Sequence, residues 1–256
     1  MPTYRLDLAY DGAGFHGFAK QPGLRTVQGD LEDVLEPWIK GASTAVAGRT
    51  DKGVHASHQV VSVSCEPLDT DRVMRSLNRQ LAPAIAVRRI AQVPDGFHAR
   101  FSATGRAYRY RIRNSAIPDP FTARTRWAYP EPLDVDAMNA AALALIGEHD
   151  FAAFCRARAG APTMRRVLWC SWRRKDLDVD LSIGASSFCH QMVRSIVAVS
   201  LEIGRGRLPV GAMEEILTSG DRSIAKGAAA PGGLTLVAVS YGIEPLPRPR
   251  WVSETS

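Results

Sequence analysis

The spacing of apolar residues predicts both strands and helices along this chain. Near the N-terminus, Tyr4, Leu6 and Leu8 alternate with charged residues, a period of two that is typical of a half-buried strand. This alternation predicts a strand over residues 3–10. A second alternation, ending near Ile183, predicts a β-hairpin across residues 166–183. Further strands are expected over residues 59–65, 84–93, 99–113 and 234–241.

Apolar residues spaced three or four apart predict helices between these strands. Thr26 can cap the first helix, because its side-chain oxygen can accept a hydrogen bond from the first turn. Asp69 and Asp134 open two further helical patterns in the same way. The expected helices cover residues 26–39, 69–81, 134–146, 188–203 and 210–218.

Strands and helices intermingle without strict alternation, which argues against a doubly wound parallel sheet. Each half of the chain offers strands and two helices. We therefore expect an α+β fold, with two α+β subdomains whose mostly antiparallel sheets pack edge to edge. The N-terminal subdomain is expected to cover residues 1–105 and the C-terminal subdomain residues 106–245, with an irregular tail over residues 246–256.

Composition and charge narrow the class of protein. The 256 residues are 45% hydrophobic and 23% charged, as in an ordinary globular protein. The net charge of +6 favours a polyanionic partner such as nucleic acid, because neutralising phosphates releases counterions. Many basic proteins bind no nucleic acid, so the charge alone is a weak indication.

The spacing of the cysteines and the lengths of the apolar runs indicate in which cellular compartment the protein is expected. The four cysteines are widely spaced and form no CxxC pair, so neither a zinc site nor a disulfide framework is expected. Reduced, mostly buried thiols are expected instead. No apolar run approaches the roughly 18 residues of a membrane span. The N-terminal alternation is that of a strand and not of a signal peptide. We expect a cytoplasmic protein without membrane contact.

Common catalytic and cofactor motifs are missing. Residues 184–188 lack the last glycine of a GxSxG elbow, and Val54 stands where a phosphate-binding loop requires lysine. His55 and His58 are three residues apart without a third convincing ligand, so no metal is expected. No cofactor is expected either, so the chemistry must come from side chains alone.

Asp51 lies in the most informative segment, which runs from Ala47 to Ala56. Gly48 and Gly53 bracket Arg49 and Asp51 just ahead of a strand, and glycines permit close approach of a ligand. Arg49 and Asp51 are two residues apart and can pair, which would keep the carboxylate ionised as a nucleophile requires. The alternative is a turn held by a salt bridge without a catalytic role, and local chemistry alone favours that alternative.

The segment from Arg106 to Arg113 combines aromatic and basic residues. In a strand, Tyr108 and Tyr110 face one way while Arg109, Arg111 and Arg113 face the other. Rings on which bases stack and guanidinium groups that meet phosphates suit RNA. A sheet with one solvated face explains the arginines about as well.

Arg194 lies near the start of a mostly apolar predicted helix. A cation on a largely buried element normally requires an anionic partner. An ordinary structural ion pair would satisfy this requirement, and so would a carboxylate such as Asp51.

Taken together, these segments resemble the TruA family of tRNA pseudouridine synthases, and the match runs nearly end to end. Around the predicted catalytic residue it includes Ala47 to Asp51 and Gly53 to Ala56. The remaining matched segments are Tyr10-Asp11-Gly12 with Phe15 and Gly17, Thr26-Val27-Gln28 with Leu31-Glu32, Gln59-Val60, Phe97 to Ala103, Arg106 with Tyr108 and Tyr110, Gly147 with His149-Asp150-Phe151 and Phe154, Met192-Val193-Arg194, and Ala230-Pro231 with Gly233-Leu234.

The resemblance implies an isomerase that converts uridine to pseudouridine at positions 38, 39 and 40 of the tRNA anticodon stem-loop. The implied fold is the pseudouridine synthase fold, with two α+β subdomains around a basic cleft, assembled as a homodimer. Asp51 matches the essential aspartate and Arg49 its neighbouring arginine. Tyr108 matches the tyrosine that stacks on the target uracil, and Arg194 the basic residue that pairs with the aspartate. Arg109, Arg111, His55 and Lys52 are expected to contact the substrate.

The chain departs from the family pattern at some positions, and two rival functions remain. Phe18-Ala19, Lys52, Ala82 and Gln191 replace the usual residues, which bears on position specificity more than on the reaction. One rival is an RNA-binding protein without catalysis, although binding alone has no need of a carboxylate near phosphates. The other is a hydrolase that uses Asp51 with His55 or His58, and it lacks a further activated group.

Overall fold

The computed structural model describes residues 1–156, 160–225, 227–242 and 245–250. Its contacts divide the chain into two compact units. Unit 1 comprises Met1–Thr104 with Thr235–Pro245, and unit 2 comprises Gly105–Leu234 with the described residues that follow Pro245. The boundary after residue 104 lies next to the expected one. Residues 235–245 differ, because sequence analysis assigned them to the C-terminal subdomain.

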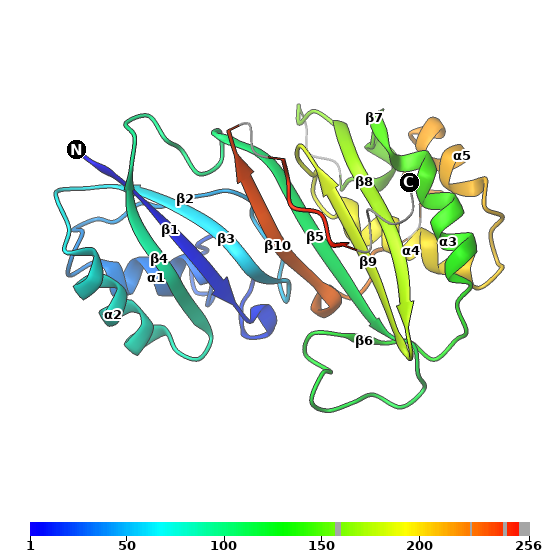
Figure 1. Ribbon diagram of the computed structural model, residues 1–256, viewed down its shortest axis with the longest axis horizontal. Helices are drawn as coiled ribbons and strands as arrows, with labels where there is room; N and C mark the ends of the chain where they lie inside the picture. The colour runs from blue at the N-terminus through cyan, green and yellow to red at the C-terminus, as the bar shows by residue number, and fades with distance from the viewer. Residues whose placement is uncertain (157–159, 226, 243–244, 251–256) are drawn as a thin grey trace. The chain divides into compact units, whose positions relative to one another are not determined.

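Unit 1 is a sheet with two helices (Figure 1). Its long strands are antiparallel, except that the last strand of the chain pairs in parallel with β3, through Thr235 opposite His55 and Leu236 opposite Ala56. This pairing explains why residues 235–245 belong to unit 1. The sheet order is β4 (Ile85–Val93), β1 (Thr3–Tyr10), β3 (His55–Ser64) and β10 (Leu234–Tyr241), with β2 (Ala45–Val46) also paired to β3.

Both helices of unit 1 begin at the predicted caps. The Thr26 hydroxyl accepts a hydrogen bond from the Gly29 N–H at 3.1 Å, and α1 spans Val27–Leu35. Asp69 accepts one from the Arg72 N–H at 3.0 Å, and α2 spans Thr70–Leu81. The helices pack on each other and α2 packs on β4. The apolar positions that predicted these elements form the core, including Leu6, Leu8, Leu31, Val73 and Leu77.

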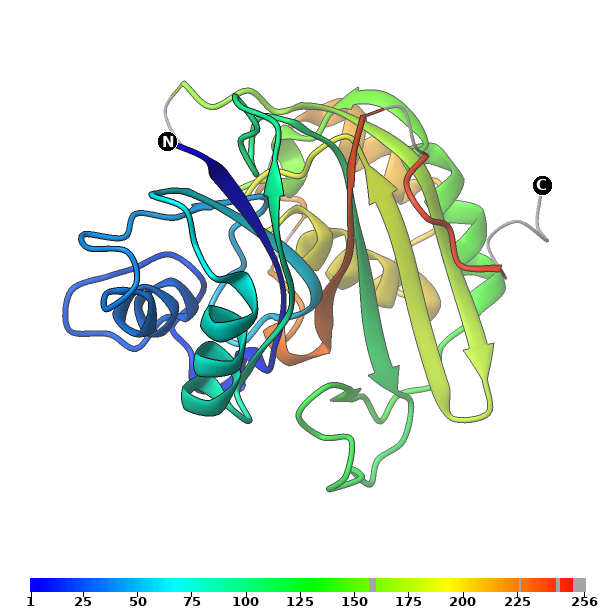
Figure 2. The ribbon, with the colours of Figure 1, turned by 60° about the vertical axis from the view of Figure 1, so that its left-hand side comes forward.

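Unit 2 is an antiparallel sheet with helices on one face, as the two views in Figures 1 and 2 show. The sheet order is β5 (Ala103–Arg113), β9 (Asp178–Ala185), β8 (Met164–Lys175) and β7 (Gly147–Asp150), with the short β6 (Trp127–Ala128) parallel to β5. The helices are α3 (Val135–Ala142), α4 (Met192–Gly204) and α5 (Ala212–Ser219). Asp134 caps α3 as predicted, accepting from the Ala137 N–H at 3.0 Å.

The α+β class with mostly antiparallel sheets is confirmed. The predicted helices and long strands all form, with shifted ends, whereas the short strands β2, β6 and β7 were not predicted. The edge-to-edge packing and the basic cleft concern how the two units are arranged, and they stay predictions. Of the expected irregular tail, residues 251–256 lie outside the described residues. In the described part of the chain, no helix is both long and apolar enough to cross a membrane.

Candidate functional site

The Asp51 segment links β2 to β3 and is held by backbone groups on both sides. The Ala47 N–H donates to the Val60 carbonyl at 2.9 Å, and the Gln59 side-chain amide donates to the Gly48 carbonyl at 2.7 Å. The Asp51 carbonyl accepts from the Val54 N–H at 3.1 Å, which closes a turn that begins at the aspartate. Asp51 is half-buried in this turn. The backbone on each side of its carboxylate is therefore fixed within unit 1.

A buried network of side chains lies beneath the segment. The Tyr10 hydroxyl accepts from the Gln59 amide at 3.2 Å and lies 2.8 Å from the Thr50 hydroxyl. Burial raises the pKa of Tyr10 to about 12, despite the hydrogen bonds with Thr50 and Gln59 that favour its ionised form. This network fixes Thr50, the residue before Asp51. Sequence reasoning assigned no role to Tyr10, Thr50 or Gln59, although all three lie in the matched segments.

Two glycines let the loop after β1 approach the Asp51 segment. A Cβ on Gly12 would lie 2.0 Å from the Val54 carbonyl oxygen, closer than real atoms approach. Gly17 has a φ of +101°, and a Cβ there would lie 3.0 Å from the Thr50 carbonyl oxygen. Gly53 adopts the permissive geometry that sequence analysis expected, with a φ of +78°. The family glycines of residues 12–17 are therefore explained by close packing on this segment.

His55 is buried against the same loop. The Gly12 N–H donates to its Nδ1 at 3.0 Å. Asp11 Oδ1 lies 3.1 Å from the same nitrogen. His55 is only 4% exposed, so its first task is structural. Its expected substrate contact stays a prediction.

Arg49 and Lys52 flank Asp51 and are both exposed. Within the described part of the chain, Arg49 forms no ion pair with Asp51. Their expected pairing in the catalytic state stays a prediction.

In unit 2, strand β5 carries the predicted aromatic and basic residues on opposite faces. Tyr108 is 8% exposed and meets Phe188 edge to face, with ring centroids 5.1 Å apart. Tyr110 is fully buried, and its hydroxyl donates to the Ala230 carbonyl at 2.7 Å. The two faces follow the strand period as expected.

The arginine face of β5 lies opposite acidic residues of β9. Arg109 is paired with Asp180, and the Arg113 guanidinium lies 3.0 Å from Asp178. Burial lowers the pKa of Arg111 from its ordinary value, and the neighbouring Arg109 lowers it further. The acidic row was visible in the sequence as the alternation of the 166–183 hairpin. Its pairing with the arginines required the register of β5 against β9.

Arg194 lies in the first turn of α4 and is half-buried. Its Nε donates to the Ala229 carbonyl at 2.7 Å, and the Ala229 N–H donates to the Arg194 carbonyl at 3.0 Å. These bonds join Arg194 to Ala229, next to the Ala230 carbonyl that accepts from the Tyr110 hydroxyl. Its expected pairing with Asp51 joins residues of different units and stays a prediction.

A disulfide joins Cys155 to Cys189, beside this part of unit 2. The expectation of reduced thiols is wrong for this pair. The two cysteines are 34 residues apart in sequence, but the fold brings their Cα atoms to 5.7 Å, a normal distance for a disulfide. Cys189 follows Phe188, the residue in contact with Tyr108. Cys65 and Cys170 are free and buried, and burial raises the pKa of Cys170 to about 12.

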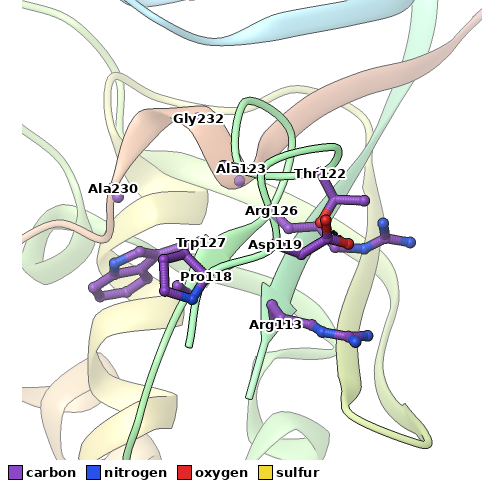
Figure 3. Close-up of a pocket in the computed structure, with 11 residues that line it drawn as sticks. Arg113, Pro118, Asp119, Thr122, Ala123, Arg126, Trp127, Ala230 and Gly232 are labelled. Carbon is purple, nitrogen blue, oxygen red and sulfur yellow. Dashed lines mark hydrogen bonds between the residues drawn. The ribbon is translucent and has the colours of Figure 1, made fainter. Parts of the chain in front are cut away.

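A pocket of about 210 Å³ lies in unit 2 between the β5–β6 loop and η4 (Pro231–Gly233), as Figure 3 shows. None of the predicted site residues lines it. Its cations Arg113 and Arg126 lie 3.0 and 3.2 Å from the Asp178 carboxylate. The Thr122 hydroxyl in its wall donates to Asp119 at 3.1 Å. Its charges are therefore largely balanced inside the unit. Among the described residues, no group of three or more His, Cys, Asp or Glu side chains could hold a metal ion.

Comparison with known proteins identifies the family. The family model described as tRNA pseudouridine synthase matches residues 141–242. The chain is 46% identical to tRNA pseudouridine synthase A of Frankia casuarinae, over 94% of this chain and 90% of that protein. It is 41% identical to the enzyme of the same name from Leifsonia xyli subsp. xyli, over 94% and 92% of the two chains. A solved archaeal box H/ACA sRNP Nop10–Cbf5 complex matches 77% of this chain and 44% of its own at 13% identity, with a TM-score of 0.33 that adds nothing to the assignment. The end-to-end identity with its relatives shows that the chain belongs to the tRNA pseudouridine synthase A family.

Proposed function

We propose that this chain converts uridine to pseudouridine at positions 38, 39 and 40 of the tRNA anticodon stem-loop, with Asp51 as the nucleophile. Membership of the family makes the chain an isomerase that forms pseudouridine in tRNA. The target positions and the role of Asp51 go further, and they rest on the matched motifs. The homodimer and the cytoplasmic location belong to the same proposal.

The observation that carries the proposal is the fixed turn around Asp51. Its neighbour Thr50 is held by Tyr10, and its own carbonyl is held by Val54. A carboxylate that is half-buried on a pre-ordered backbone can attack or accept a proton without first losing conformational freedom. The close packing of Gly12 on Val54 also holds this turn against the loop after β1.

The reaction is an isomerisation without a redox step. The N1–C1′ bond of uridine breaks, the uracil turns, and a C5–C1′ bond forms while C5 loses its proton and N1 gains one. Asp51 acts as an ionised carboxylate, either by covalent attack or by assisting removal of a ribose proton. The target nucleotide must first leave the helical stack, which costs a few kcal/mol.

The other site residues hold the substrate and the carboxylate in this proposal. Tyr108 stacks on the uracil, with its ring oriented by the edge-to-face contact with Phe188. Arg49 and Arg194 hold Asp51 ionised and oriented, Arg194 from the start of α4. Lys52 is exposed beside Asp51 and meets the RNA backbone. Arg109 and Arg111 remain candidate phosphate contacts, although the acidic residues of β9 already balance much of their charge.

Tritium release from tRNA that carries 5-³H-uridine tests the reaction and the nucleophile together. Wild type should release tritium, and Asp51→Asn should release it at least about 1,000-fold more slowly while binding tRNA within about threefold of wild type. Asp33→Asn is the matched control, because it removes the same charge from a 75% exposed side chain. Mapping of pseudouridine on the product then tests the three positions. Normal turnover by Asp51→Asn would remove this residue from the mechanism.

A further inference from the structure

The β4–β5 connection in unit 1 presents an aromatic ring to solvent. Phe101 is 76% exposed, whereas Phe15 and Phe18 of the same unit are 2% and 0% exposed. An exposed phenylalanine on a loose loop would be unremarkable, because single apolar residues are common on surfaces. The connection around Phe101 is instead tightly ordered.

The middle of this connection is anchored in the core. Ala99 is fully buried and packs with Ala47 and Val60. Its N–H donates to the Ser62 hydroxyl at 3.0 Å, and its carbonyl accepts from the Tyr241 hydroxyl at 2.8 Å. The backbone next to Arg100 and Phe101 therefore has little freedom.

The ring of Phe101 rests on the ring of His98. The two centroids are 4.4 Å apart and the planes are inclined by 34°. His98 Nδ1 accepts from the N–H groups of Arg100 and Phe101, at 3.1 and 3.3 Å, which fixes the imidazole beneath the phenyl ring. Ser102 closes the turn, since its N–H donates to the His98 carbonyl at 2.9 Å. The ordered loop therefore holds the His98 imidazole against the Phe101 ring.

Charge beside the ring favours an RNA base over an apolar partner. The Arg100 guanidinium lies 5.4 Å from the Phe101 centroid, within the range of a cation–π contact. Arg100 is exposed, and the acidic residue of this connection, Asp95, lies at its other end. A rigid aromatic face with an adjacent cation is the usual platform for an unpaired base, with the cation near its phosphate.

We propose that His98, Arg100 and Phe101 form a stacking site for an unpaired base of the RNA substrate, separate from the target uridine. The choice of RNA as the occupant rests on the proposed function. Because hydrogen bonds within unit 1 already hold the platform in place, binding a base there costs little conformational entropy of the protein.

The test is the affinity of the full-length chain for an unmodified anticodon stem-loop RNA. Phe101→Ala should weaken binding about 5- to 100-fold, the range measured for loss of one base–aromatic stack, and Phe101→Tyr should restore it to within about threefold. The matched control is Phe121→Ala, which removes a 97% exposed phenylalanine from the β5–β6 loop and should leave the affinity unchanged. Thermal unfolding of each variant checks that the exposed substitution leaves the fold intact.

Salt dependence separates stacking from charge. Phe101→Ala should leave the slope of log affinity against log salt unchanged, because a stack releases no counterions. Arg100→Ala should lower that slope by about 1.

Several outcomes would overturn the platform. These are wild-type affinity in Phe101→Ala, no binding of this RNA by wild type, or a change of oligomeric state in Phe101→Ala with unchanged RNA affinity, which would indicate a protein interface. Binding that depends on Phe101 without tritium release by wild type would support the platform and contradict the proposed function. Normal turnover by wild type, together with wild-type RNA affinity in Phe101→Ala, would support the proposed function and contradict the platform.

Discussion

The Asp51 segment of unit 1 and strand β5 of unit 2 both combine charge with close packing, but they treat charge differently. Around Asp51, the cations Arg49 and Lys52 are exposed and, within the described residues, form no salt bridge. On β5, Arg109 and Arg113 are paired with Asp180 and Asp178 of the neighbouring strand. The paired arginines of β5 are therefore less available to a phosphate than Arg49 and Lys52 are.

The two regions also fix their backbones by different means. Strand β5 is held by a regular antiparallel ladder with β9 over eight residue pairs. The Asp51 segment has no such ladder over residues 47–54, and it relies on glycine contacts and a buried tyrosine hydroxyl. A segment held by a few specific contacts should be more sensitive to single substitutions than a ladder strand is.

The largest effect is expected for Gly12→Ala. The new methyl group would lie 2.0 Å from the Val54 carbonyl oxygen. The backbone cannot shift freely, because the Gly12 N–H donates to His55 and the Val54 N–H donates to the Asp51 carbonyl. We expect a loss of about 2–3 kcal/mol in the free energy of unfolding, typical of overpacking, and a larger loss of pseudouridine formation than of RNA affinity. Urea unfolding and tritium release measure the two effects.

Gly14→Ala is the control for this substitution. Gly14 lies in the same short 3-10 helix, but a Cβ there would meet only an arginine side chain at 3.7 Å. Its stability and turnover should stay near wild type. Equal effects of the two substitutions would mean that the packing of Gly12 on Val54 does not hold the Asp51 segment.

An effect confined to high pH is expected from ionisation of Tyr10. Its pKa of about 12 in the folded chain lies above the ordinary value of 10.0. As the pH rises above 10, the unfolded chain loses this proton first, so the folded state loses stability between pH 10 and 12. The total loss should be about 2–3 kcal/mol, which corresponds to two pKa units.

Urea unfolding of wild type and Tyr10→Phe at pH 8, 10 and 12 measures this contribution. At pH 8 the variant should be about 1–2 kcal/mol less stable, because the hydrogen bonds with Thr50 and Gln59 are lost. The difference should shrink toward pH 12. If the free energy of unfolding fell equally with pH in both proteins, burial would not be keeping Tyr10 protonated.

The sequence predicted what depends on local pattern. Thr26, Asp69 and Asp134 cap helices where expected, and the alternation around Leu6 forms β1. The short strand β7 was missed, because its four residues, Gly-Glu-His-Asp, include no apolar side chain that could show a period. Such strands form because a longer neighbour, here β8, offers them a hydrogen-bonding edge.

For the site, sequence motifs named residues but not their partners. The contacts of Gly12 with Val54, of Tyr10 with Thr50 and of Cys155 with Cys189 all join positions more than 30 residues apart. The spacing of Arg49 and Asp51 suggested a further pair, which stays a prediction. Spacing predicts contact only where the backbone is regular, and around Asp51 it is not.

The smallest effects should distinguish the two sets of cations directly. Arg49→Ala and Lys52→Ala should each weaken RNA binding about 3- to 10-fold and lower the salt slope by about 1, as loss of one phosphate contact does. Arg109→Ala should weaken binding less than Arg49→Ala does, because Asp180 already balances much of the charge of Arg109 in the free protein. Titration of the stem-loop RNA at several salt concentrations, with Arg79→Ala as a control on the exposed end of α2, gives both quantities. If Arg109→Ala lowered the salt slope as much as Arg49→Ala, the paired arginines of β5 would be phosphate contacts after all, and pairing in the free protein would be a poor guide to which cations meet RNA.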